Sequence, residues 1–251
     1  MIVERVSRRF GARLALDDVH LAIAPGRLCA LCGGNGAGKT TLLRVIAGFL
    51  DADRGRVRLP EGARLGYLPE GAPVPPELTV AEYVGHRAIL AGVRGDARAA
   101  AVARALTEVE LTARADEPMG RLSKGLRQRA ALAGVLVGEP AVLILDEPAS
   151  GLDELQRTEL RARLRALAGA RTILWSTHEL SDVEAVADQI VVLAGGRVVA
   201  DGDVAAVKAR AGTGPAPLRD AIAALAAAGA GAGAEEGAGR GEDEDRGEGA
   251  R

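Results

Sequence analysis

The feature that most constrains this chain is a glycine-rich segment that links an apolar run to a helical stretch. Residues 33–41 read Gly-Gly-Asn-Gly-Ala-Gly-Lys-Thr-Thr; they follow the apolar run 27–31 and open a helix predicted over 41–47. The segment matches G-x-x-x-x-G-K-[ST] in the strand, loop and helix order that this motif requires. Glycines let successive backbone N–H groups turn inward toward a phosphate, and the helix N-terminus adds favourable electrostatics. The segment therefore predicts a phosphate-binding site.

Two side chains of this loop carry specific expectations. The ammonium of Lys39 is expected to reach the β- and γ-phosphates of a nucleotide, and the hydroxyl of Thr40 is expected to bind Mg²⁺. The alternative is a glycine-rich turn without function. It does not explain why a predicted strand precedes the loop and a predicted helix follows it, as the motif requires. The loop residues expected to contact the nucleotide are Gly33, Asn35, Gly36, Ala37, Gly38, Lys39, Thr40 and Thr41.

A pair of acidic residues supplies the second half of the predicted site. Asp146 and Glu147 directly follow the apolar run 141–145, which we predict to be a strand covered on both faces. Hydrolysis of a nucleotide needs a carboxylate near the metal and a second group that orients or deprotonates the attacking water. Asp146 is expected to take the first role and Glu147 the second. Two acids in this position are often only a strand end that meets solvent, but the upstream loop favours a function.

Short apolar runs alternate with helical stretches along the chain, which is typical of an α/β fold with a largely parallel sheet. The predicted strands cover residues 3–7, 19–24, 27–31, 65–68, 141–145, 172–176 and 190–193. Between about 72 and 134 the pattern changes to helices, most clearly at 80–90 and 97–109. We expect this block to be a helical lobe inserted into a domain that covers residues 1–228.

The C-terminal segment 229–251 contains glycine, alanine and charged residues but no large apolar side chain. It cannot bury enough surface to offset chain entropy, so we predict a disordered acidic tail. The segment before it, 217–228, is a candidate helix that packs on the domain.

Charge and hydropathy exclude two classes of function. The formal net charge is −2, whereas nucleic-acid binders usually show a strongly basic face, so we expect no nucleic-acid partner. No apolar run approaches the roughly 20 residues needed to cross a bilayer, and the N-terminus is too charged for a cleavable signal. We therefore expect a cytoplasmic protein whose membrane role, if any, depends on a partner.

The two cysteines form a C-x-x-C pattern, which invites a redox or metal interpretation. Cys29 and Cys32 lie within or directly after a predicted buried strand, where residues three apart point to opposite faces. We therefore interpret both as small core residues.

Three further motifs resemble those of the ABC ATPases. Residues 122–129, Leu-Ser-Lys-Gly-Leu-Arg-Gln-Arg, resemble the L-S-G-G-Q signature; residues 150–153, Ser-Gly-Leu-Asp, resemble the D-loop; and Thr177-His178, after a strand, resemble the switch histidine. The resemblance covers about residues 1–210, in the order and spacing of the family. It implies a P-loop ATPase of the ABC type, with a mixed sheet core, an antiparallel β part near the N-terminus and an inserted helical lobe.

The resemblance also implies roles for individual residues. Phe10 occupies the position of the aromatic residue that stacks on adenine, although a simple core phenylalanine is the alternative. Ser123 and Gly125 would contact the γ-phosphate of ATP bound to another subunit, so two chains would face each other head to tail around two nucleotides. His178 would contact the γ-phosphate of its own ATP. Asp153, in the D-loop, is a further candidate for nucleotide binding.

Two positions depart from the family pattern. Glu70 stands where the family usually has the Q-loop glutamine; a carboxylate there can still ligate Mg²⁺ or position water. Lys124 replaces the first central glycine of the signature, and Leu126 replaces its glutamine. The resulting L-S-K-G pattern resembles a subgroup of ATPases that serve bacterial exporters.

The resemblance implies an ATPase that powers a membrane transporter, with ATP and Mg²⁺ bound at a dimer interface. Its expected partners are a membrane-spanning permease on a separate chain and a second ABC ATPase subunit, which would hold it peripherally at the inner face of the membrane. One alternative is a soluble ABC ATPase that acts on a macromolecular assembly. Another is an inactive binding module, which the presence of Lys39, Asp146, Glu147, Ser123 and His178 argues against.

Overall fold

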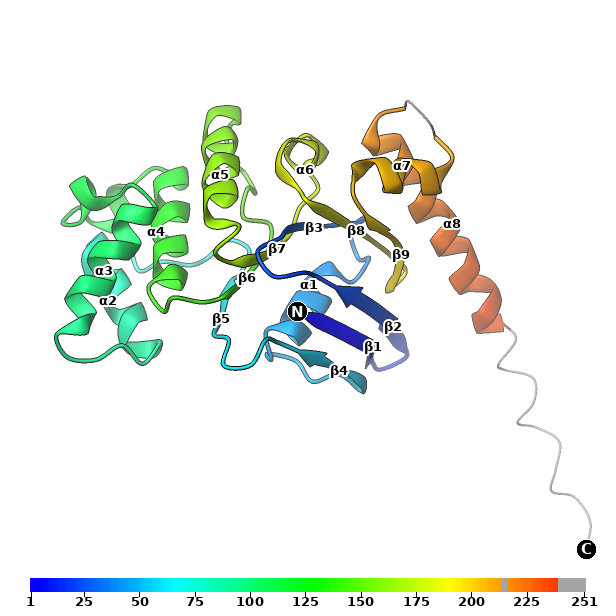
Figure 1. Ribbon diagram of the computed structural model, residues 1–251, viewed down its shortest axis with the longest axis horizontal. Coiled ribbons are helices and arrows are strands. Elements are labelled where there is room, and N and C mark those ends of the chain that lie inside the picture. Colours follow the sequence, from blue (N-terminus) through cyan, green and yellow to red (C-terminus); the bar gives the residue numbers. More distant parts are fainter. Residues whose placement is uncertain (214–215, 239–251) are drawn as a thin grey trace, which may run out of the picture.

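The computed structural model describes residues 1–213 and 216–238, and within these ranges the strands form two sheets (Figure 1). The smaller sheet is antiparallel and has the order β2-β1-β4; the larger has the order β5-β6-β7-β3-β8-β9 and is parallel except for the antiparallel pair β8 and β9. The strands are β1 (Ile2–Phe10), β2 (Arg13–Ala22), β3 (Leu28–Cys32), β4 (Arg54–Arg58), β5 (Leu65–Leu68), β6 (Val142–Leu145), β7 (Thr172–Ser176), β8 (Gln189–Ala194) and β9 (Arg197–Gly202).

Helices cover the larger sheet and one of its edges (Figure 1). In the described residues they are α1 (Lys39–Ile46), α2 (Val80–Leu90), α3 (Ala97–Glu108), α4 (Lys124–Leu136), α5 (Glu154–Leu167), α6 (Leu180–Val186), α7 (Val204–Ala211) and α8 (Leu218–Ala238), with short 3₁₀ turns at Thr112–Arg114 and Met119–Arg121. The sequence interpretation is confirmed here: the fold is α/β with a mixed sheet, an antiparallel part near the N-terminus and a group of helices beside β5.

The larger sheet separates two hydrophobic cores because successive residues of a strand point to opposite faces. In β3, Leu28, Ala30 and Cys32 belong to the core formed with α2–α8, whereas Cys29 and Leu31 belong to the core formed with α1 and the smaller sheet. Both cysteines are fully buried and free. Burial raises the pKa of the Cys32 thiol to about 12. The prediction that the two cysteines are core residues on opposite faces is confirmed.

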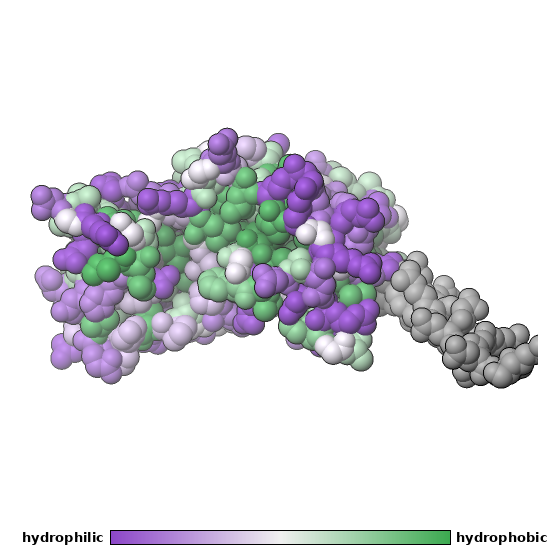
Figure 2. Space-filling model, turned by 90° about the horizontal axis from the view of Figure 1, so that it is seen from below, coloured by the Kyte–Doolittle hydropathy of each residue, from purple (hydrophilic) through white to green (hydrophobic). Residues whose placement is uncertain are grey.

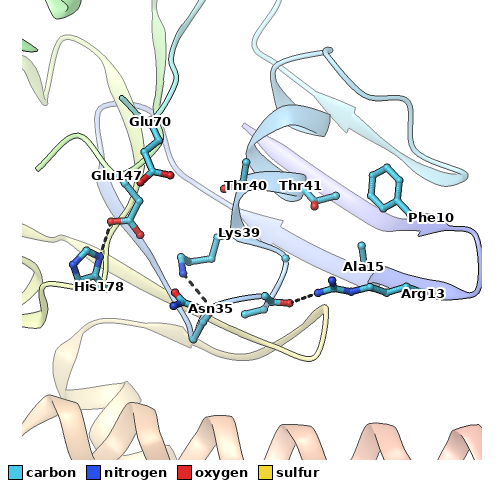
Figure 3. Close-up of a pocket in the computed structure, with 14 residues that line it drawn as sticks. Phe10, Arg13, Ala15, Asn35, Lys39, Thr40, Thr41, Glu70, Glu147 and His178 are labelled. Atoms are coloured by element: carbon cyan, nitrogen blue, oxygen red, sulfur yellow. Dashed lines mark hydrogen bonds and ion pairs between the residues drawn. The ribbon is translucent and has the colours of Figure 1, made fainter. Parts of the chain in front are cut away.

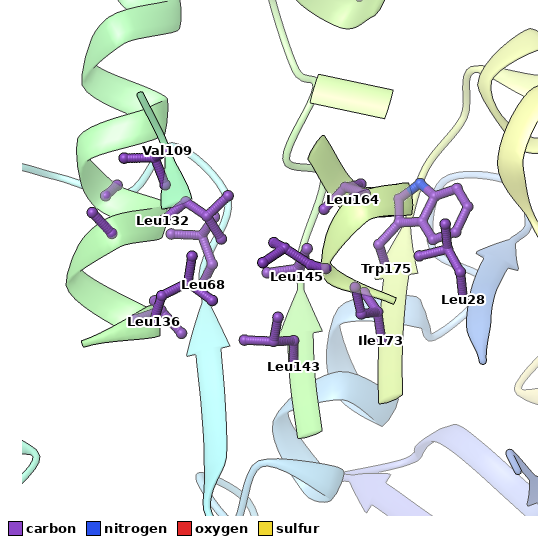
Figure 4. Packing of buried hydrophobic residues seen from close by; sticks show 14 of the residues in the cluster. Leu28, Leu68, Val109, Leu132, Leu136, Leu143, Leu145, Leu164, Ile173 and Trp175 are labelled. Atoms are coloured by element: carbon purple, nitrogen blue, oxygen red, sulfur yellow. The ribbon is translucent and has the colours of Figure 1, made fainter. Parts of the chain in front are cut away.

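The helices α2, α3 and α4 are attached to the sheet through apolar packing. Figure 4 shows Leu132 and Leu136 of α4 beside Leu68 at the end of β5, with Leu145 of β6 next in the layer. All four are buried. Figure 4 also shows Trp175 of β7, the single tryptophan of the chain, in the part of the core that α5 covers. This core therefore runs without interruption from the helices beside β5 to the centre of the sheet.

Several boundaries differ from those expected. The strands β1 and β2 are longer than the predicted runs 3–7 and 19–24, and β4 and β9 were not predicted. β4 reads Arg-Gly-Arg-Val-Arg and lies at the edge of its sheet, where little burial is required and the apolar pattern is weak. The helix expected at 217–228 is present, with Leu218, Ile222 and Leu225 buried.

The predicted tail differs from the structure at its beginning. Helix α8 continues to Ala238, past the expected boundary at 228; alanine and glutamate favour a helix in this segment, whereas its glycines oppose one. Residues 239–251 of the predicted disordered tail lie outside the described residues. No helix within 1–213 and 216–238 combines the length and the apolar character required to cross a bilayer.

Candidate functional site

The loop between β3 and α1 is shaped by glycines that lie too close to neighbouring backbone for a side chain. A Cβ on Gly33 would lie 2.3 Å from the carbonyl oxygen of Leu193, and one on Gly38 would lie 2.6 Å from that of Ala15. Gly38 also has φ of +106°, which side chains rarely adopt. Lys39 opens α1, and its Nζ donates to the carbonyl oxygens of Gly33 at 2.8 Å and Gly34 at 3.3 Å. The ammonium is therefore held over the loop.

A cavity of about 560 Å³ opens above this loop (Figure 3). It brings together residues that are far apart in the sequence: the loop itself, Phe10 of β1, Glu70 after β5, and Glu147 and His178 after β6 and β7. The residues that line it are Phe10, Arg13, Ala15, Gly34, Asn35, Gly36, Ala37, Gly38, Lys39, Thr40, Thr41, Glu70, Glu147 and His178. Most of the predicted site residues thus surround one cavity.

Asp146 is 2% exposed and lies next to this cavity, bonded to the lining residue Thr40, in a network of hydroxyl donors. Its Oδ1 accepts from Ser176 Oγ at 2.7 Å and from Thr40 Oγ1 at 3.4 Å, and its Oδ2 accepts from the Tyr67 hydroxyl at 3.4 Å. Burial, and then the neighbouring Asp146 carboxylate, raise the pKa of Tyr67, so this hydroxyl stays protonated as a donor.

The same oxygen atoms fit a magnesium ion. Mg²⁺ is usually held by one or two carboxylates together with water and substrate phosphates, rather than by an all-protein cage. Thr40 and Asp146 bring a hydroxyl and a carboxylate within 3.4 Å of each other, directly beside the loop, and Glu70 lines the cavity nearby. Among the described residues no three His, Cys, Asp or Glu side chains gather into a metal cluster. The donor set therefore suits a metal that arrives with a nucleotide.

Glu147 and His178 form a hydrogen-bonded pair on the wall of the cavity (Figure 3). Glu147 Oε2 lies 2.9 Å from His178 Nδ1. The backbone of Glu147 has φ of +47°, and its N–H donates to Ser176 Oγ at 2.8 Å. A left-handed conformation costs a non-glycine residue about 1–2 kcal/mol. The strand β7 thus supplies the hydroxyl that helps to hold Glu147 in an unfavourable conformation facing the loop.

Phe10 and Arg13 lie at the other end of the cavity. Phe10 is 45% exposed, so it is not a core residue, and the guanidinium of Arg8 lies 5.0 Å from its ring centroid. Arg13 Nη2 donates to the carbonyl oxygen of Gly36 at 3.1 Å. The sequence interpretation missed Arg13, although the pairing of β1 with β2 sets it opposite Phe10. A short turn at Gly11-Ala12 between two apolar runs was the signal that could have found it.

Five predicted site residues do not line this cavity. Gly33 and Asp146 are bonded to the lining residues Lys39 and Thr40, but the other three lie apart. Ser123, Gly125 and Asp153 line a separate cavity of about 260 Å³ between α4 and α5. Ser123 Oγ accepts from the backbone N–H of Leu126 at 3.3 Å, and Asp153 Oδ1 accepts from that of Gln156 at 2.8 Å, so both side chains cap the helix that follows them. Within one chain they are therefore not joined to the loop.

The fold and the geometry of the loop define a P-loop nucleotide-binding protein. The sequence model of the family described as ABC transporter matches residues 16–150. The chain belongs to this family as an ATP-binding subunit, and it is an ATPase.

The sequence relatives include transport proteins of both directions. The chain is 35% identical over 210 residues to the Nod factor export ATP-binding protein I of Burkholderia pseudomallei. The aligned region covers 79% of this chain and 69% of that protein. It is 37% identical over 207 residues to the spermidine/putrescine import ATP-binding protein PotA of Pseudomonas aeruginosa, covering 78% of this chain and 57% of that protein. A solved ATP-binding subunit of an ABC transporter is similar at a TM-score of 0.75 and 30% identity, covering 89% of this chain and 98% of that one.

Proposed function

We propose that this ATPase powers a membrane transporter, with a preference for export, and that it works as a head-to-tail dimer. The observation that supports a dimer is the separation of the two cavities. Ser123 and Gly125 lie in one, and the loop with Lys39 lies in the other. A second chain facing the first would bring the Ser123 hydroxyl and the N-terminus of α4 to the phosphates held by the opposite loop.

Within each site, different side chains bind the nucleotide, hold the metal and activate the attacking water. Lys39 and the loop N–H groups bind the β- and γ-phosphates, with Phe10 and Arg13 at the adenine end of the cavity. Thr40 and Asp146, with Glu70 as a further candidate ligand, would hold Mg²⁺, which supplies charge neutralisation at the phosphates when bound. Glu147 orients and deprotonates the attacking water, and His178 contacts the γ-phosphate from the side. Ser176 keeps both acids in place through hydrogen bonds to the Asp146 carboxylate and from the Glu147 backbone.

A groove between the sheet and the helices beside β5 supports the proposed permease partner. It has a volume of about 430 Å³, and its lining includes Phe49 and Leu90, which are 65% and 78% exposed. Exposed apolar side chains of this size in one groove are typical of a protein interface. Figure 2 views the molecule from below, the side of α1 and β4 in Figure 1, and shows hydrophobic residues gathered in the middle of that face between hydrophilic ones.

We propose that a short helix of the permease occupies this groove, which we call the docking groove. Two arginines at its rim, Arg64 and Arg87, would pair with acidic side chains or a helix C-terminus of the partner. Residues 72–134 then act as a lobe that transmits the closure of the dimer to the permease, and Glu70, between the ATP cavity and this lobe, lies on the path. The protein would thus lie at the inner face of the membrane through its partner.

The replacement Leu90→Glu is expected to release the permease while leaving the ATP site intact. A carboxylate in an apolar groove must be desolvated on docking, so we expect about tenfold less partner to be recovered. The measurement is affinity purification from mild-detergent membranes in the presence of ATP. Tagged Glu147→Gln, expected to trap the closed dimer, is compared with the same chain that also carries Leu90→Glu. Ile2→Glu, at an exposed apolar residue of β1 outside the groove, is the matched control.

The identity of the captured protein decides between the two classes of function. Recovery of a membrane-spanning chain that depends on Leu90 supports the transporter proposal, and the known direction of that partner tests the preference for export. Recovery of only a soluble macromolecular assembly, with equal yield from both variants, would overturn the transporter proposal.

A further inference from the structure

The imidazole of His178 faces a carboxylate at each of its two nitrogen atoms. Nδ1 lies 2.9 Å from Glu147 Oε2, and Nε2 lies 3.6 Å from Glu179 Oε1. The His178 side chain is 60% exposed, so packing alone does not fix its ring. A single hydrogen bond at Nδ1 leaves the ring free to rotate away from the cavity. Carboxylates at both nitrogens restrict the doubly protonated ring to one orientation, because both nitrogens of that form are donors.

Glu179 is itself held by groups outside the ATP cavity. Its Oε1 forms an ion pair with Arg157 Nη1 of α5 at 3.1 Å, and its backbone N–H donates to Thr177 Oγ1 at 3.0 Å. The Glu179 side chain is 34% exposed and that of Arg157 only 21%. This degree of burial makes the pair less screened by solvent than a surface ion pair.

Arg157 is anchored in turn to its own helix and the next one. It pairs with Glu154 of α5, and Glu154 also pairs with Arg161, whose Nη1 lies 2.7 Å from Asp182 Oδ1 on α6. Asp182 is only 4% exposed; burial raises its pKa, and the Arg161 guanidinium opposes that effect. The chain of contacts thus fixes the start of α6, which begins two residues after His178, against α5.

We propose that Glu179, held by Arg157, is a positioning residue that orients His178 toward Glu147 and the γ-phosphate. This inference rests on the proposed roles of Glu147 and His178. Glu179 does not line the ATP cavity, and it acts through the imidazole. Oriented in this way, the ring meets an arriving phosphate without first losing rotational freedom.

The kinetic test is Glu179→Ala measured with saturating and limiting MgATP. We expect kcat to fall about tenfold while KM for ATP changes by less than about twofold, because the loop that binds the nucleotide is untouched. Arg157→Ala is expected to give a smaller loss of the same kind, and Arg157→Lys to restore most of it. The control is Glu184→Ala, which removes a carboxylate of α6 that pairs at 3.4 Å with Lys208 and does not line the ATP cavity.

The double variant separates this inference from the proposal on which it rests. If Glu179 acts through the histidine, Glu179→Ala causes no further loss in a His178→Ala background. Equal losses in both backgrounds would overturn the positioning role. If His178→Ala alone left kcat unchanged, the proposed role of His178 would fail instead.

A spectrum of the nucleotide-free protein tests the orientation without any activity. The chain has three histidines, so comparison with His178→Ala assigns the side-chain ¹⁵N signals of His178. We expect one sharp set of signals in the wild type and averaged or split signals in Glu179→Ala. Identical His178 signals in the two proteins would contradict the inference.

Discussion

Glu147→Gln is expected to lower kcat for ATP hydrolysis about 10²–10³-fold while ATP binding is retained. The amide has nearly the same shape as the carboxylate, so the backbone bond to Ser176 and the packing around residue 147 survive. It can no longer accept a proton from water, and removal of a general base typically costs 10²–10⁴-fold. Hydrolysis at saturating MgATP, together with equilibrium binding of a fluorescent ATP analogue, measures the two effects separately.

A second glutamate with a similar positive φ provides the control. Glu139 has φ of +51°, close to the +47° of Glu147, but it lies after α4, forms an ion pair with Arg104 at 2.5 Å and does not line the ATP cavity. Glu139→Gln should therefore leave kcat unchanged. A loss of less than about threefold for Glu147→Gln would remove Glu147 from the catalytic role.

Lys39→Ala is expected to weaken ATP binding about 100-fold and to reduce hydrolysis to the background rate. The ammonium supplies a charge-assisted hydrogen bond to phosphate oxygens, and the other two lysines of the chain, Lys124 and Lys208, both within the described residues, do not line the cavity. Without nucleotide it bonds to the carbonyl oxygens of Gly33 and Gly34, so the variant also loses contacts that order the loop. Isothermal titration with ATP and Mg²⁺ measures the affinity, and the melting temperature in the absence of nucleotide reports on the fold.

Lys208→Ala is the matched control for this variant because Lys208, on α7, pairs with Glu184 and does not line the cavity. It should bind ATP like the wild type. If Lys39→Ala bound ATP with unchanged affinity, the loop would not be the nucleotide site, and the catalytic roles proposed for the residues around it would be wrong.

The sequence predicted well the parts of the molecule that local chemistry determines. The loop around Lys39 required glycines between a buried strand and a helix, and the structure has this order of elements. The runs 65–68 and 172–176 coincide with β5 and β7, and the predicted strand 141–145 matches β6 except for its first residue. The strands β6 and β7 are buried along their whole length, and such strands are continuous and apolar. The opposite directions of Cys29 and Cys32 followed from the two-residue period of a strand.

The sequence predicted less well where long-range pairing makes the site. Arg13 reaches Gly36 only because β1 and β2 form a hairpin, and Tyr67 and Ser176 reach Asp146 only because β5, β6 and β7 are neighbours in the sheet. None of these three carries a motif of its own. The contact of Glu179 with His178 and Arg157 depends on the packing of α5 against α6 in the same way.

The ATPase activity of a mixture of two inactive variants tests whether one chain alone can complete an ATP site. Lys39→Ala retains the cavity of Ser123, and Ser123→Arg retains the loop. A mixed dimer therefore contains one intact site. We expect each variant alone to be inactive and an equimolar mixture to recover about a quarter of the wild-type rate, since half of the dimers are mixed and each has one of two sites. A mixture no more active than its components, with dimers present, would show that the two chains do not share their ATP sites.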